Sequence, residues 1–348
     1  MQRVIPASIG MGLGVVSVSM AAKLVESRQD PPNFGFDKGA CRFDQSSFNG
    51  RWFQLISNFD PSTILSSDAQ VREAQKFIED AKKNGGSDDK KLWGAQKLVS
   101  SALHPDTDEI VPPPFRMAGY VPFNGPICIA MMAATTTPAL LFWNWANQSQ
   151  NALVNYFNRN ASSVMTNEML LKSYAGAVSA ALIVAFGVST FIKRSFSPAT
   201  AQNLLKFVAF PSSCVASCGN AYVMRKGEID SGISVEDGNG KELGLSKKAA
   251  EFAVRDTVIS RAILQVPVFF VTPLVTSMPP FTALAASSPG LGVAISAFLT
   301  TVSFGIGLPA AVAYFPSRAS VRLGELEGEL QKQSGLSADA TVFYNKGL

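Results

Sequence analysis

Charged residues are scarce in this sequence of 348 residues: they make up 16% of it, against about a quarter in an average soluble protein. The shortage is uneven, because residues 1–116 and the twice longer remainder each hold 28 of the 56 charges. This pattern excludes an intrinsically disordered chain and an ordinary soluble enzyme. No Asp, Glu, Lys or Arg occurs in four windows: 117–158, 173–192, 207–224 and 262–317.

Cysteine and histidine are also rare. The four cysteines, Cys41, Cys128, Cys214 and Cys218, show no paired spacing typical of an extracellular disulfide framework. Two of them lie four residues apart on one helical face, but with no nearby histidine we interpret them as packing residues. The single histidine, His104, has no recognisable nucleophile beside it and is interpreted as a turn or helix-end residue. We therefore predict no cofactor, no metal site and no nucleic-acid partner.

The charge-free windows predict transmembrane helices. A span needs about 20 apolar residues, because the hydrocarbon core is about 30 Å thick and contains no water to bond the backbone. The window 262–317 is too long for one span and is interrupted by prolines, so we divide it in two. The predicted fold class is an all-α membrane protein of about five transmembrane helices with a small, mainly helical N-terminal extramembrane region. The predicted spans are 121–146, 174–192, 207–224, 262–282 and 291–314.

The domain organisation follows from the spans. The N-terminal region should hold helices over 68–83 and 88–103, the first opened by a capping box of Ser67 and Gln70. The long connection after the third span should form a short hairpin near 233–243, then a basic amphipathic helix. The predicted parts are a leader or extension at 1–40, the helical extramembrane region at 41–116, the five-span domain at 117–317 with an extramembrane loop at 225–261, and a C-terminal tail at 318–348.

The first 28 residues allow three interpretations. A charge-free stretch, 4–22, follows Arg3 and is rich in Gly, Ser and Val. It fits a secretory-type leader, a mitochondrial targeting segment, or a sixth span that uses a small-xxx-small contact. All three stay open at the level of sequence.

Lysine and arginine near the span ends predict an orientation. Most of them fall in 159–172, 225–261 and the C-terminal segment, which the positive-inside rule assigns to the interior, or matrix, side. The same count assigns Lys97 and Arg116 to the opposite side.

Carboxamide side chains recur along residues 142–160. Their steps of four, three, four and three residues put them on one face of a helix. Such a face is costly in a membrane unless it meets protein or a water-filled cavity. The side chains therefore line a solute path, or they bond helix to helix or lie at the membrane interface. The path candidates are Asn144, Asn147, Gln148, Asn151, Asn155, Asn158 and Arg159, with Asn220 in the third span.

Helix-breaking residues occur inside several predicted spans. Pro211 lies in the third, Pro267 and Pro273 in the fourth, and the run 305–309, Gly-Ile-Gly-Leu-Pro, in the fifth. Backbone groups freed at such breaks can bind a solute. Each break alone is weak support for transport, because proline kinks are also common in structural membrane helices.

Several short motifs are typical of one protein family, among them Asp60-Pro61, His104-Pro105-Asp106-Thr107, Asn147-Gln148-Ser149 and the terminal Tyr344-Asn345-Lys346-Gly347-Leu348. With these motifs the chain, from about Arg42 to Leu348, resembles the sideroflexins, a family of multi-span carriers of the mitochondrial inner membrane. The form of residues 224–228, Met-Arg-x-Gly-Glu, is most similar to the tricarboxylate-carrier-like branch. Gln150 departs from the family, which usually has Phe or His there. The matching motif residues to which we assign no role are Asp60, Pro61, His104, Pro105, Asp106, Thr107, Arg116 and Arg225.

This resemblance implies transport of serine or related small neutral amino acids across the mitochondrial inner membrane, in support of one-carbon metabolism, without enzymatic chemistry. Citrate is the alternative substrate, but a buried trianion would need several Arg or Lys, and the predicted spans contain none. A zwitterion needs only local dipoles. Iron ranks lower, since no cluster of His, Cys or carboxylates is recognisable. An alternative from another class is a membrane scaffold or assembly factor.

Overall fold

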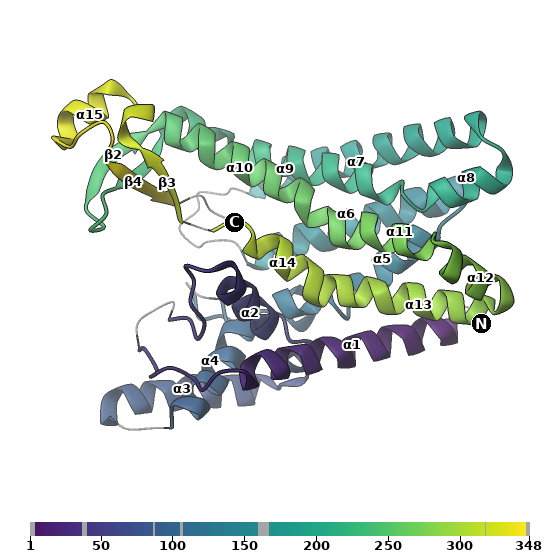
Figure 1. The fold of residues 1–348 in the computed structure, drawn as a ribbon, viewed down its shortest axis with the longest axis horizontal. Helices are drawn as coiled ribbons and strands as arrows, with labels where there is room; N and C mark the ends of the chain where they lie inside the picture. The colour runs from purple at the N-terminus through teal and green to yellow at the C-terminus, as the bar shows by residue number, and fades with distance from the viewer. Residues whose placement is uncertain are drawn as a thin grey trace.

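The molecule is an elongated bundle of helices. The computed structural model describes residues 4–36, 40–85, 88–104, 107–158, 167–316 and 318–345. The long helices run along the longest axis, and a group of short helices and a small sheet both lie at one end of it (Figure 1). At the other end lie α8 (Pro198–Leu205) and α12 (Pro279–Ser287).

Four helices in the described residues are long and apolar enough to cross a membrane. They are α1 (Val4–Ser27), α7 (Asn167–Ser195), the helix that runs through α10 (Lys247–Gln265) to α11 (Thr272–Thr276), and the helix that runs through α13 (Pro289–Val302) to α14 (Leu308–Ala313). The predicted spans 174–192 and 291–314 coincide with two of them. The fourth predicted span, 262–282, ends early, because the chain turns at Ser277 and Met278 before α12. The prediction of a mainly helical, multi-pass membrane protein is confirmed.

The first predicted span, 121–146, is not one helix. Its residues form α5 (Asn124–Ala133) and most of α6 (Thr137–Phe157), joined by a short turn. Thr136 starts α6, since its side chain accepts a hydrogen bond from the N–H of Ala139 and Pro138 occupies the first turn. The prediction missed this cap because it used the absence of charge, which continues through the threonines.

The chain reverses between α5 and α6. Phe115, before α5, stacks on Phe157 at the end of α6 with ring centroids 4.7 Å apart, and Asn158 Nδ2 donates to the Phe115 carbonyl at 2.8 Å. Residues before and after this helix pair therefore lie at the same end of the bundle. The predicted orientation was wrong for Lys97 and Arg116, which lie at the end that also carries the hairpin.

The third predicted span becomes α9 (Ala209–Ser231), which packs between α7 and α10. Pro211 lies in its first turn, so it does not interrupt the helix. Cys214 Sγ and Cys218 Sγ approach the carbonyls of Ala262 and Val258 on α10 at 3.8 and 3.3 Å, as expected for packing residues.

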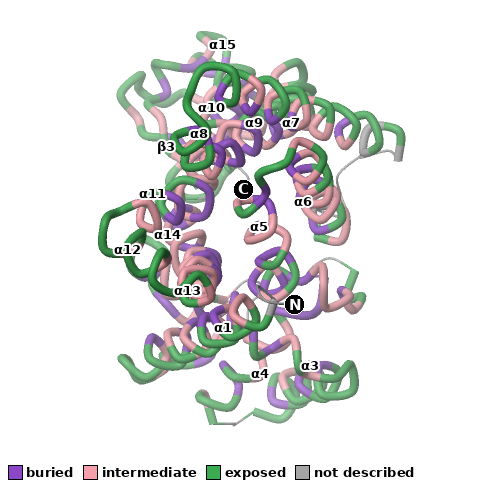
Figure 2. The backbone as a smooth tube through the Cα atoms, turned by 90° about the vertical axis from the view of Figure 1, so that its right-hand side faces the viewer, coloured by how far each residue is buried: buried purple, intermediate pink, exposed green. Residues whose placement is uncertain are grey.

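Helix α1 lies against α13, as the end-on view also shows (Figure 2). Gly10 and Gly14 face α13: an added Cβ would lie 1.9 Å from the Ala294 carbonyl oxygen and 2.6 Å from Thr301 Cβ, respectively. A Cβ added at Gly12, between them, would meet no other part of the described structure within 4 Å. This contact has the small-xxx-small spacing that the sixth-span interpretation of residues 1–28 requires.

The N-terminal region contains α2 (Phe48–Asn58), α3 (Asp68–Asn84) and α4 (Asp89–Ala102), with short 3₁₀ turns η1 (Pro61–Leu65), η2 (Pro113–Phe115) and η3 (Met117–Tyr120). The predicted capping box is confirmed, since Ser67 and Gln70 bond each other's backbone N–H groups. The region packs on the membrane helices: Arg51 Nε donates to the Ala313 carbonyl at 2.9 Å, and Trp52 Nε1 to the Ile306 carbonyl at 3.1 Å.

A four-stranded antiparallel sheet lies at the same end as the N-terminal region (Figure 1). Strands β1 (Ile233–Glu236) and β2 (Glu242–Ser246) form the predicted hairpin, and β3 (Arg318–Arg322) and β4 (Thr341–Asn345) extend it in the order β2-β1-β4-β3. Val235, Val342 and Leu323 pack under the sheet with α15 (Gly328–Ser334) and the start of α10. The C-terminal segment is therefore folded onto the hairpin, a pairing that local sequence patterns did not predict.

Candidate functional site

A cavity of about 360 Å³ lies within the bundle, where the membrane helices meet the N-terminal region. Its wall combines α6, α9 and α10 with α2, α4, η3 and the beginning of α5. Pockets of this size accommodate small ligands. Its carboxamide-bearing residues are Asn58, Asn124, Asn147, Gln148, Asn151, Asn220 and Gln265, and its hydroxyl-bearing residues are Ser100, Ser101, Tyr120, Ser217 and Ser260.

Half of the predicted path residues line this cavity. Asn147, Gln148 and Asn151 do so from α6, and Asn220 from α9. Asn147 and Gln148 are buried, and the Cys128 thiol donates to Asn147 Oδ1 at 3.5 Å. The polar face of α6 therefore meets a cavity over about one turn.

The other predicted path residues lie elsewhere. Asn144 is fully buried and bonds helix to helix: Ser212 Oγ of α9 donates to its Oδ1 at 2.8 Å, and its Nδ2 donates to the Leu140 carbonyl at 2.8 Å. Asn158 is exposed and bonds the Phe115 carbonyl at the bundle end. The Asn155 side chain and Arg159 lie outside what the structure describes. Gln150, the residue that departs from the family, faces away from the cavity and donates to the Pro114 carbonyl at 2.7 Å.

The predicted helix breaks in the fourth and fifth spans become wide turns beside the cavity. Residues Val266–Val271 (η4) and Ser303–Gly307 (η5) are π-helical, and Val268, Phe269 and Phe304 within them line the cavity. The two breaks face each other, with Thr272 Oγ1 and Ser303 Oγ 3.3 Å apart. Such turns are frequent at functional sites because they disturb the regular backbone bonding.

A second cavity, of about 540 Å³, lies toward the opposite end of the bundle. It shares α5 and the broken helices with the first, but its wall begins about one turn further along, at Thr272 and Thr300. A cluster of buried apolar residues adjoins the first cavity, and three of its members line that cavity. Its members are Val121, Cys128, Met131, Ala209, Val268, Phe269 and Phe304.

Arg261 is a site residue that the sequence reasoning missed. It is the only charged side chain among the described residues that line the first cavity. Its position next to the charge-free window led to its assignment to the extramembrane loop. However, α10 is one helix from Lys247 to Gln265. Ser260, Leu264 and Val268 are spaced four residues apart and Arg261 lies beside them, so these residues form one continuous face that lines the cavity. That helical periodicity was the available signal.

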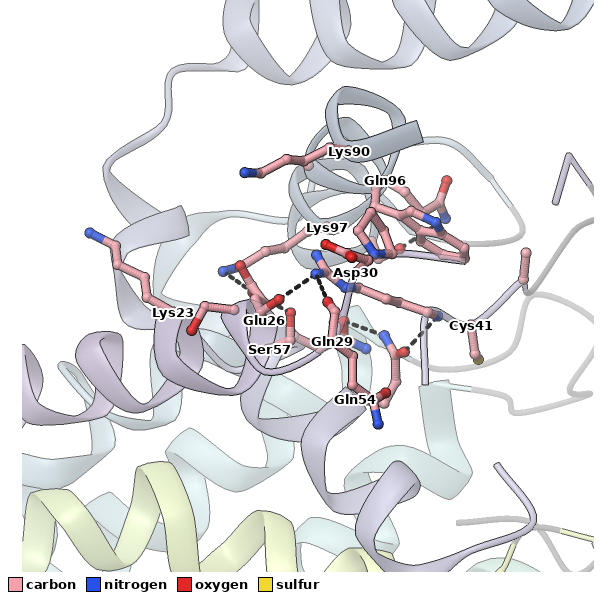
Figure 3. Close-up of a pocket in the computed structure, with 18 residues that line it drawn as sticks. Lys23, Glu26, Gln29, Asp30, Cys41, Gln54, Ser57, Lys90, Gln96 and Lys97 are labelled. Carbon is pink, nitrogen blue, oxygen red and sulfur yellow. Dashed lines mark hydrogen bonds and ion pairs between the residues drawn. The ribbon is translucent and has the colours of Figure 1, made fainter. Parts of the chain in front are cut away.

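Lys97 of α4 links three parts of the chain close to the first cavity. Its Nζ lies 2.7 Å from Glu26 Oε1 of α1 and 2.7 Å from Asp60 Oδ2 before η1, while Ser57 Oγ donates to Glu26 at 2.6 Å. Figure 3 shows Lys97 reaching toward Glu26 in a wider polar cavity. Burial raises the pKa of the Asp60 carboxyl, but Lys97 and the N–H of Ser62 outweigh it and hold that pKa below its ordinary value. Ser57 and Asp60 of this network flank Asn58 and Phe59 in the chain, and these two residues line the first cavity.

The remaining family-motif residues brace the bundle end. Pro61 is buried in η1 after Asp60. His104 Nδ1 accepts a hydrogen bond from the N–H of Thr107 at 3.3 Å, which makes the described part of that motif a turn; Pro105 and Asp106 lie outside the described residues.

Arg116 and Arg225 also have contacts away from the cavity. Buried Arg116 donates to the Val111 carbonyl at 2.8 Å and lies 3.6 Å from the Asp68 carboxylate. Its burial lowers the pKa of the guanidinium, and Asp68 acts in the opposite direction. Arg225 pairs with Glu228 at 2.6 Å and donates to Thr257, which ties α9 to α10.

Comparison with known proteins identifies the family. The protein-family model described as Sideroflexins matches residues 38–348. This chain belongs to the sideroflexin family. The human protein Sideroflexin-5 is 37% identical over 90% of this sideroflexin and 93% of its own length, and Sideroflexin-5 of Caenorhabditis elegans is 38% identical over 90% and 96%. Mouse Sideroflexin-1 is 35% identical over 92% of this chain and 100% of its own. No solved structure matches.

Proposed function

We propose that this sideroflexin transports serine and related small neutral amino acids across the mitochondrial inner membrane, supplying one-carbon metabolism. The observation that carries the proposal is the cavity enclosed by α6, α9 and α10, whose wall is rich in amide and hydroxyl groups and holds one described charge. Amides and hydroxyls offer donors and acceptors to a zwitterion without net charge. Discontinuous helices beside a central site are typical of secondary transporters.

Charge favours a zwitterion over citrate. Three carboxylates would require several cations within reach, because each buried anion needs a partner. Arg261 is the one described cation in the wall, while Arg116 and Arg225 are engaged outside it.

Uptake of labelled serine into liposomes containing the purified full-length chain tests the proposal. We expect saturable uptake, inhibited by alanine and cysteine and little by citrate. Asn151→Leu should abolish it without loss of inserted protein, because an apolar side chain then replaces a carboxamide in the cavity wall. Gln150→Leu is the matched control on the same helix, since Gln150 bonds the Pro114 carbonyl outside the cavity.

Two results would contradict this function. Absence of saturable uptake of serine, alanine and cysteine would favour the scaffold or assembly function. Normal uptake by Asn151→Leu would show that the polar face of α6 is not the path.

A further inference from the structure

The second cavity, of about 540 Å³, carries polar groups of two complementary kinds in its wall. Its lining residues come from α5, α8, α11, α12 and α13, toward the end of the bundle at which α8 and α12 lie (Figure 1). A cavity of this volume accommodates a small ligand. No described residue lines both cavities, so a ligand here would occupy a separate site.

Lys206 supplies the first kind of group, a positive charge. It directly follows α8 and is the only charged side chain among the described residues that line this cavity. It is half-buried, and its Nζ donates to Asn203 Oδ1 at 3.4 Å. An ammonium has three N–H donors, so one such bond leaves donors for a ligand. The positive wall favours a ligand with an anionic group.

Hydroxyl groups on the broken helices supply the second kind of group, hydrogen-bond acceptors. Thr276, Ser296 and Thr300 line the cavity, and each hydroxyl donates to a carbonyl of its own helix at 2.8–3.0 Å. A hydroxyl has one hydrogen, which this bond uses, while its oxygen can still accept. Such neutral acceptors suit an ammonium group, which has donors only.

We propose that the second cavity is a further binding site for the transported amino acid. Lys206 pairs with the carboxylate, and the hydroxyl oxygens of Thr276, Ser296 and Thr300 accept hydrogen bonds from the ammonium group. This inference rests on the proposed function and adds a site toward the other end of the bundle. A cation and neutral acceptors in one cavity select a zwitterion, because an amine without a carboxylate loses the pair with Lys206 and a carboxylate without an amine leaves the acceptors unused.

Protection of an introduced cysteine reports the occupancy of this cavity separately from the first. Ala286→Cys places a thiol in the cavity wall on α12, at an exposed position outside the proposed ligand contacts. The full-length chain is held in phosphatidylcholine nanodiscs, and modification by a water-soluble thiosulfonate is followed, with the wild-type rate subtracted for the native cysteines. Serine should slow the modification saturably. Ethanolamine, which lacks the carboxylate, and lactate, which lacks the ammonium group, should slow it little at equal concentration.

The matched control for the thiol is Ser287→Cys, the exposed neighbour on α12 that does not line the cavity, and serine should not protect it. In the Ala286→Cys background, Lys206→Gln should raise the serine concentration for half-protection about fivefold or more, since the pairing of a half-buried cation is partly screened. Lys206→Arg keeps the charge and should retain most of the affinity. Lys193→Gln, an exposed lysine in the last turn of α7 outside the cavity, should change nothing.

The outcomes distinguish the two proposals. Protection of Ala286→Cys by serine without uptake would overturn the transport function and leave the second site standing. Saturable uptake without this protection, or with equal protection of Ser287→Cys, would overturn the second site alone. So would half-protection that Lys206→Gln leaves unchanged, or lactate that protects as well as serine. Slowing by phosphatidylglycerol added to the nanodiscs, with no effect of serine, would make the cavity a lipid site and overturn the assignment.

Discussion

Replacing Lys97 by methionine should destabilise the joint between α1, α4 and η1. Methionine retains most of the apolar stem but removes the ammonium that lies 2.7 Å from both Glu26 and Asp60. The Asp60 side chain is 2% exposed, so among the described residues its carboxylate would keep only its hydrogen bonds with Ser62. Removing one partner of a buried ion pair costs about 3–5 kcal/mol. Because Lys97 and Glu26 are partly exposed, we expect the lower end, about 3 kcal/mol at neutral pH.

The effect should depend on pH in a defined direction. The folded-state pKa of Asp60 lies below its ordinary value, so the ion pair stabilises the wild-type protein above the ordinary carboxyl pKa and is lost as pH falls through the lowered one. In Lys97→Met the unpaired Asp60 carboxylate destabilises the fold only while it is ionised. The difference in unfolding free energy between the two proteins should therefore shrink from neutral pH toward about pH 4.

Denaturant unfolding in detergent measures this difference, followed by the fluorescence of Trp93 on α4, which is buried and donates to the Pro32 carbonyl at 2.8 Å. Lys90→Met is the matched control, because Lys90 lies on the same helix as Lys97 and lines the same wider polar cavity, but its side chain is exposed. A loss below about 1 kcal/mol, the level of an exposed pair, would refute the reasoning. So would an equal loss in the control, or a loss that does not change with pH.

Two further substitutions test packing within the membrane helices. Asn144→Leu should reduce the free energy of unfolding by about 1 kcal/mol while serine uptake per folded molecule persists. A double-mutant cycle with Ser212→Ala should give an interaction energy of about 0.6–1.7 kcal/mol between the two side chains. An interaction energy of zero would contradict the hydrogen bond between the two helices. Gly10→Leu should lower the thermal unfolding midpoint by displacing α1 from α13, whereas Gly12→Leu should not, because only Gly10 touches Ala294; equal shifts in both would show that α1 does not pack as described.

Periodicity and caps predicted the local structure well. The capping box at Ser67, the hairpin near residue 233 and the apolar helices at 174–192 and 291–314 depend on neighbouring residues, and each was found where expected. The split of the first predicted span was missed, because a threonine cap inside an apolar run is a weaker signal than the run itself. The pairing of β1 with β4 joins segments about 100 residues apart, and no local pattern specifies such a partner.

In the candidate site, too, some residues were predicted from the sequence and others were not. The spacing of Asn147, Gln148 and Asn151 put them on one helical face, and they share one cavity. The same spacing included Asn144, which is fully buried and instead bonds Ser212 of α9. Arg261 reaches the site from α10, and the charge windows had placed it in the extramembrane loop. Asn124 reaches the site from α5, which the spacing along α6 does not indicate.

The scarcity of charge was enough, by itself, to determine that the chain is a multi-pass membrane protein, because the cost of burying charge and unbonded backbone in lipid constrains composition directly. The motif residues were enough to place it among the sideroflexins. Only the tertiary structure decided which polar residues face a cavity and which bond a neighbouring helix, and that one arginine joins the carboxamides. Those distinctions depend on what lies across from each side chain, and the local sequence does not encode its spatial neighbour.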